Sequence, residues 1–115
     1  MIFPAFFALL IGLGMIAQWT LSYVNKQIPE LQSEPIRIKF HLVAEMLTAI
    51  SLLVAAIGLL ISAPWATSLY LIAVGMLFYT SVVSPGYFAQ QGQWGWLVMF
   101  GLIIILGITS VFIIL

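Results

Sequence analysis

The chain has 115 residues, of which 64% are hydrophobic and 5% are charged, and its formal net charge is zero. Soluble domains are about half apolar and about a quarter charged, so this composition excludes a soluble fold and predicts a surface in contact with lipid. The balanced charge leaves no basic surface for a nucleic acid, and the absence of cysteine excludes disulfides, thiolate metal sites and cysteine nucleophiles.

The first predicted membrane span covers residues 3–24, FPAFFALLIGLGMIAQWTLSYV. About 20 apolar residues cross a bilayer as a helix, and this run is too long, and lacks the basic start, for a signal peptide. We therefore expect a retained transmembrane helix. Gly12 and Gly14 form an isolated G-x-G inside this run, which predicts close helix packing rather than a phosphate-binding loop.

Three further spans are predicted, at about residues 36–61, 64–84 and 94–115. Ser33 is the predicted N-cap of the second span, with Pro35 in its first turn. Pro64 opens the third span after a two-residue link, so the second and third spans are expected to form a tight antiparallel hairpin. The run Ser84–Pro85–Gly86 predicts the end of the third span.

Four spans with short links predict an all-α membrane protein, an up-down-up-down antiparallel four-transmembrane-helix bundle that forms a single integral membrane domain over residues 1–115. A β-barrel is not expected, because its spans are about ten residues long and alternate in polarity. The basic residues Lys26, Arg37 and Lys39 lie in or beside the first link. The positive-inside rule then predicts a prokaryotic cell-membrane protein with residues 25–35 in the cytoplasm and both termini outside.

The second span carries two ionisable side chains, His41 and Glu45, within the run RIKFHLVAEMLT. Residues four apart share one face of a helix, and Arg37 and Thr48 extend that face. Polar faces of spanning helices point into the bundle, because lipid offers no hydrogen-bond partner. The sequence therefore predicts that this pair faces the interior.

The other spans place polar side chains at a matching depth in the predicted cytoplasmic half. If Lys39 marks the membrane interface, Glu45 lies about 9 Å deeper at the helical rise of 1.5 Å per residue. Gln18 and Tyr79 lie about 10 Å and about 9 Å from the ends of their own spans. We therefore predict a polar pocket that is closed toward the outside by apolar packing and suits a small ligand. Its predicted lining is Gln18, His41, Glu45 and Tyr79.

Three classes of function stay open. The leading class binds or transports a small ligand, proton or cation in this pocket. The candidate ligand-binding residues are Glu45, His41, Gln18, Tyr79, Thr48 and Arg37. The second class is a structural or accessory membrane subunit, whose polar groups tie helices to each other or to a partner. The third is a small membrane enzyme that uses Glu45 and His41 as acid and base on a lipid-soluble substrate, although no catalytic residue is assigned.

A metal site within one subunit is not expected. His41 and Glu45 could share one ion, but two ligands are too few for a structural zinc site. The other carboxylates of the chain, Glu30 and Glu34, lie in the first link. No cofactor is expected, and the expected partners are the lipid bilayer and a small-molecule ligand or ion. Because four spans give little room for a transport path, a homodimer also stays open.

Overall fold

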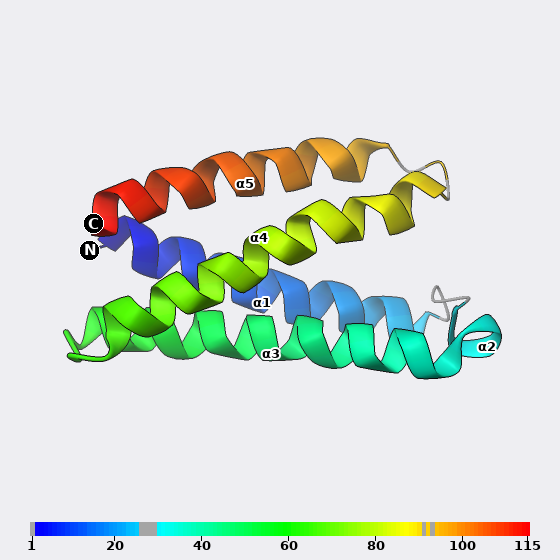
Figure 1. Ribbon diagram of the computed structural model, residues 1–115, viewed down its shortest axis with the longest axis horizontal. Coiled ribbons are helices and arrows are strands. Elements are labelled where there is room, and N and C mark those ends of the chain that lie inside the picture. The colour runs from blue at the N-terminus through cyan, green and yellow to red at the C-terminus, as the bar shows by residue number, and fades with distance from the viewer. Residues whose placement is uncertain (1, 26–29, 91, 93) are drawn as a thin grey trace.

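The computed structural model describes residues 2–25, 30–90, 92 and 94–115. Its helices are α1 (Ile2–Val24), α2 (Glu30–Ser33), α3 (Pro35–Leu60), α4 (Ala66–Gln90) and α5 (Gly95–Ile114) (Figure 1). The candidate membrane spans are Ile2–Val24, Pro35–Leu60, Ala66–Val83 and Gly95–Ile114, each long and apolar enough to cross a bilayer. The predicted all-α, four-span fold is thus confirmed, and it indicates an integral multi-pass membrane protein.

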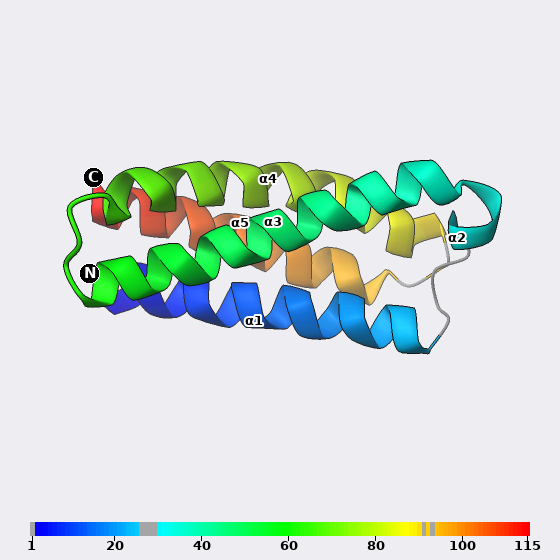
Figure 2. The ribbon, with the colours of Figure 1, turned by 90° about the horizontal axis from the view of Figure 1, so that it is seen from below.

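The long helices pack in chain order, with α3 between α1 and α4, and α5 beside α4 (Figures 1 and 2). Successive helices run in opposite directions, so both termini lie beside the turn between α3 and α4 (Figure 1). We call this the Trp65 end of the bundle, after the tryptophan in that turn. The opposite end, where α1 stops at Val24 and α5 starts at Gly95, is the Asn25 end.

A short turn makes the hairpin of α3 and α4. Its backbone N–H groups reach back to the last turn of α3, from Ala63 to the carbonyl of Gly58 at 2.8 Å and from Ser62 to that of Leu59 at 3.3 Å. Ser62 has φ of 56°, in the left-handed region. This is the pattern of a Schellman motif, which satisfies the final carbonyls of a helix, and it confirms the predicted tight antiparallel hairpin.

Small residues fill the core near the Trp65 end and let the helices approach each other. The buried alanines there are Ala5, Ala8, Ala55, Ala56, Ala66 and Ala73. Tyr70 is the largest fully buried side chain, and its hydroxyl donates to Oγ of Ser110 at 2.5 Å. Ser110 in turn donates to the carbonyl oxygen of Gly107 at 2.7 Å, so this polar chain ties α4 to α5.

The two glycines of the first span have opposite roles. A Cβ atom on Gly12 would lie 3.0 Å from the carbonyl oxygen of Ala49 and 3.0 Å from the side chain of Leu53. A Cβ atom on Gly14 would meet nothing within 4 Å. The predicted close packing is therefore confirmed at Gly12, where α1 meets α3, and wrong at Gly14, which faces open space.

Two predicted helix ends were wrong. The N-cap of α3 is Glu34 rather than Ser33, because Ser33 ends the short helix α2, although Pro35 does lie in the first turn. Helix α4 continues through 85–86 to Gln90, although the candidate membrane span within it ends at Val83, next to the predicted end of the third span. A proline removes one backbone hydrogen bond from its helix, and helices of membrane proteins tolerate that loss.

The basic residues behind the predicted orientation are described in part. Lys26 lies outside the described residues. Arg37 and Lys39 are exposed near the start of α3, and Nη1 of Arg37 lies 3.4 Å from Oε2 of Glu34. These charges mark the Asn25 end as the more polar one, and the side of the membrane that it faces stays a prediction.

We expect Gly12→Ala to lower the free energy of unfolding by about 1–3 kcal/mol, because the backbone oxygen of Ala49 cannot rotate away from the added methyl group. Gly14→Ala is the matched control in the same helix. It should be neutral or stabilise by up to about 1 kcal/mol, because alanine is the better helix former. Denaturant titration in detergent micelles measures both, and equal effects would contradict the asymmetric packing.

Candidate functional site

His41 and Glu45 form a pair at the interface of α1 and α3. Nε2 of His41 lies 3.4 Å from Oε1 of Glu45, and only 2% of Glu45 is exposed. Trp19 of α1 meets the imidazole edge-on, with ring centroids 5.5 Å apart and an interplanar angle of 75°. The predicted inward face of this helix is thus confirmed for Glu45. Trp19 and α3 hold the histidine on one side of the carboxylate.

A cavity of about 720 Å³ lies beside Glu45, between α1 and α5. Small-molecule sites in proteins usually measure about 300–1,000 Å³. The polar residues that line it are Gln18, Ser22 and Asn25 of α1 or its end, Glu45 of α3 and Thr80 of α4. Nε2 of Gln18 donates to Oγ of Ser22 at 3.3 Å, so these two side chains of α1 present a linked amide and hydroxyl.

The polarity of the lining changes along the cavity. The polar side chains of α1 lie toward the Asn25 end, whereas Leu10 and Ile11, from the same helix, line the part nearer the Trp65 end. Leu77 and Ile103 complete that apolar part from α4 and α5. From residue 25 to residue 10 the cavity follows α1 for about 22 Å at the helical rise. It is therefore long enough for an extended molecule with one polar end.

Two phenylalanines pack on Gly107 and close the bundle beyond the apolar part of the cavity. A Cβ atom on Gly107 would lie 2.7 Å from Cε1 of Phe78 and 3.6 Å from Cζ of Phe7. Helices α1, α4 and α5 therefore meet at this glycine. The predicted apolar closure of the pocket on this side is consistent with that contact.

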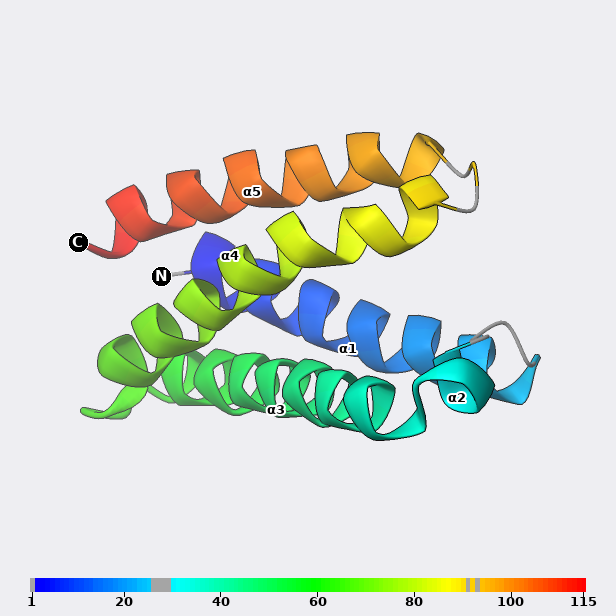
Figure 3. The same ribbon diagram turned by 45° about the vertical axis from the view of Figure 1, so that its right-hand side comes forward.

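The cavity opens along the contact between α1 and α5. These two helices approach each other near the termini and diverge toward the Asn25 end (Figures 1 and 3). Leu10, Leu21 and Met99 line the cavity and are also exposed on the outside of the bundle. This opening lies on the side of the bundle, between two candidate membrane spans.

The structure brings some of the predicted site residues together. Gln18 and Glu45 both line the cavity. His41 is not among the lining residues, and it touches Glu45 from the α1–α3 interface. Thr48 is buried, but its hydroxyl donates to the carbonyl oxygen of Ala44 at 2.8 Å within its own helix.

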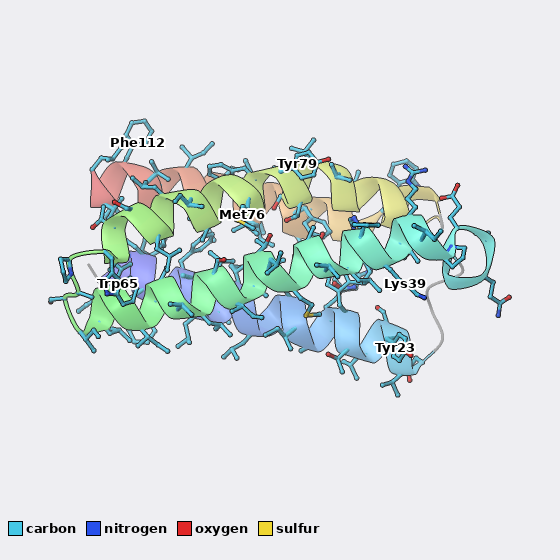
Figure 4. All side chains as sticks on the ribbon, turned by 60° about the horizontal axis from the view of Figure 1, so that its bottom comes forward. Tyr23, Lys39, Trp65, Met76, Tyr79 and Phe112 are labelled. Carbon is cyan, nitrogen blue, oxygen red and sulfur yellow. The ribbon has the colours of Figure 1, made fainter. Side chains whose placement is uncertain are left out.

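Tyr79 and Arg37 lie elsewhere, so their predicted places beside the pocket were wrong. Tyr79 is 70% exposed and points away from the bundle (Figure 4). Neighbouring positions on a helix differ by 100°, and the next residue, Thr80, takes the inward position. The side chain of Arg37 is 83% exposed and pairs with Glu34 at the surface.

Sequence reasoning missed the aromatic part of the lining, which consists of Trp19, Trp96 and Phe100. Tryptophans are common at membrane interfaces, so the residue type alone does not indicate an interior position. The spacing of Trp96 and Phe100, four residues apart, puts both on one face of α5 and was the available signal. For Trp19 no spacing in the sequence separates an interior position from an interfacial one.

A family model described as "Domain of unknown function (DUF8058)" matches residues 2–115. The chain belongs to this family. No curated protein and no solved structure matches it.

The DUF8058 site offers oxygen and aromatic groups rather than a metal-ligand set. Among the residues that the structure describes, no group of three or more His, Cys, Asp or Glu side chains could hold a metal ion. The cavity presents one carboxylate, two amides, two hydroxyls and three aromatic rings. Such groups can orient a small organic molecule through hydrogen bonds, charge and ring contacts.

The burial of the His41–Glu45 pair predicts energetic coupling between its members. We expect a double-mutant cycle of His41→Asn and Glu45→Gln to give a coupling on the order of 1 kcal/mol in the free energy of unfolding. Denaturant titration in detergent micelles measures each variant. The Glu34–Arg37 pair has the same 3.4 Å separation but is exposed, so Glu34→Gln with Arg37→Gln should show no measurable coupling. Equal coupling in the two cycles would contradict burial as its source.

Proposed function

We propose that this protein binds a small amphiphilic molecule, drawn from the bilayer, in the cavity between α1 and α5. The observation that carries this proposal is a cavity of about 720 Å³ that passes from polar to apolar beside a buried carboxylate. The polar end would hold the head of the ligand, and Leu10, Ile11 and Ile103 would surround its apolar part. The opening between α1 and α5 supplies the route from lipid.

The position of Glu45 supports a ligand-binding role. Placing a carboxylate inside a membrane costs about 2.5–3.5 kcal/mol on insertion scales, so such residues mark functional sites more often than structural ones. Glu45 also lines a cavity that a small molecule can fill.

The same geometry supports the other classes of function less well than it supports binding. An accessory subunit needs no cavity of this size, because its polar groups would pack against one another. An enzyme that used Glu45 and His41 as acid and base would need both at the substrate, and His41 is not in the lining. Transport would need a path past the contact of Phe7 and Phe78 at Gly107. Binding requires neither a second catalytic group in the lining nor a path through the bundle.

A substitution that fills the cavity tests the proposal. Gly14 lines the cavity and a Cβ atom there meets nothing within 4 Å, so Gly14→Leu would place a side chain into the space without displacing a neighbour. Gly75→Leu is the matched control, because Gly75 is equally open but lies outside the lining. The probes are benzyltrimethylammonium and its uncharged isostere neopentylbenzene, added to protein in nanodiscs of zwitterionic lipid.

Ligand binding raises the temperature of unfolding by mass action. We expect at least one probe to raise it for the wild type and for Gly75→Leu, and neither probe to raise it for Gly14→Leu. Tryptophan fluorescence during heating reports the transition. The proposal fails if neither probe stabilises the wild type, or if Gly14→Leu is stabilised as much as Gly75→Leu.

A further inference from the structure

We infer that the ligand carries a positive charge and that Glu45 is its counter-ion. This inference rests on the proposed function and narrows it to one chemical class, amphiphilic organic ammonium ions. It follows from the charges around the cavity, the aromatic lining and the distribution of apolar residues along the cavity.

The described lining of the cavity contains a carboxylate and no lysine or arginine. The basic side chains of the chain are Lys26, Arg37 and Lys39, so α1, α4 and α5 contribute no lysine or arginine. Arg37 is held at the surface by Glu34, about 12 Å before Glu45 along α3 at the helical rise. His41 touches the carboxylate from outside the lining. Among the described residues that line the cavity, Glu45 is therefore the one with a charged side chain.

Three aromatic rings add a second attraction for cations. Trp19 lines the cavity from α1, and Trp96 and Phe100 line it from one face of α5. The faces of aromatic rings are electron-rich, and tryptophan is the strongest of them in binding ammonium groups. In a site removed from water, such rings compensate for the hydration that a quaternary ammonium loses. Neither an anion nor an uncharged head would gain both attractions.

The apolar part of the cavity indicates which chemical group the ligand carries beside its ammonium ion. Beyond Gly14 the lining contains Leu10, Ile11 and Ile103 and no charged side chain. An inorganic cation would leave this part empty and would keep its own strong hydration. An ammonium ion with an attached aromatic or alkyl group fills both parts, with its charge beside Glu45. A single carboxylate also provides too few oxygen ligands for a divalent cation.

The test compares two molecules of one shape that differ in charge. Benzyltrimethylammonium and neopentylbenzene differ only by a quaternary nitrogen in place of a carbon. Dissociation constants are measured for wild type, Glu45→Gln and Glu34→Gln in nanodiscs of zwitterionic lipid. Glu34→Gln is the matched control, because it removes the same charge from an exposed pair outside the cavity.

We expect the cation to bind the wild type and Glu34→Gln at least about tenfold more tightly than Glu45→Gln, as for the loss of a charged partner. Neopentylbenzene should bind all three proteins within about threefold of one another. Trp96→Leu is a second variant that keeps the carboxylate. It should weaken binding of the cation by at least about threefold and leave the uncharged isostere less affected.

The outcomes separate the two proposals. If neopentylbenzene binds the wild type as tightly as the cation, or if Glu34→Gln loses as much affinity as Glu45→Gln, the charge assignment is overturned and the cavity still binds a ligand. If neither molecule binds the wild type, both proposals fail. If Glu45→Gln does not fold, equal weakening of both probes by Trp96→Leu overturns the charge assignment.

Discussion

The close approach of α1 to α3 at Gly12 is the contact on which the other features of the bundle depend. With only a hydrogen atom facing the carbonyl of Ala49, the two backbones pack without a layer of side chains between them. Helix α1 is thereby held against α3 and contacts α5 much less. Because α5 is held to α4 through Tyr70 and Ser110 near the Trp65 end, the space opens at the other end of the α1–α5 contact.

The polar side chains inside the bundle fall into two groups with different consequences. Tyr70 donates a hydrogen bond to Ser110, and Ser110 donates one to the backbone, within a packed core. These bonds provide the partners that lipid does not supply. Gln18 and Glu45 lie where the helices diverge, and they border a cavity. The first group stabilises the bundle. The second group has space beside it that only a further molecule, water or ligand, can occupy.

The sequence predicts the spans well because lipid imposes a strict rule on them. A run of about 20 apolar residues must be helical, since every backbone group has to be satisfied within its own segment. The depth of Gln18 and Glu45 follows from the same helical rise. The direction in which a side chain points around the helix axis does not follow from the rise. The predicted direction was wrong for Tyr79, whose apolar ring and polar hydroxyl suit either side of a helix near the membrane interface.

A pocket near Glu45 could be predicted, but its position between α1 and α5 could not, because that position depends on how far apart two helices lie rather than on any residue alone. Gly12 and Gly14 are alike in the sequence, yet Gly12 packs closely against α3 and Gly14 borders the open space. The difference is their position on the helix relative to a neighbour that only the folded bundle defines. Helix α3 packs against both α1 and α4, so Glu45 and its neighbour His41 are held beside the cavity between α1 and α5.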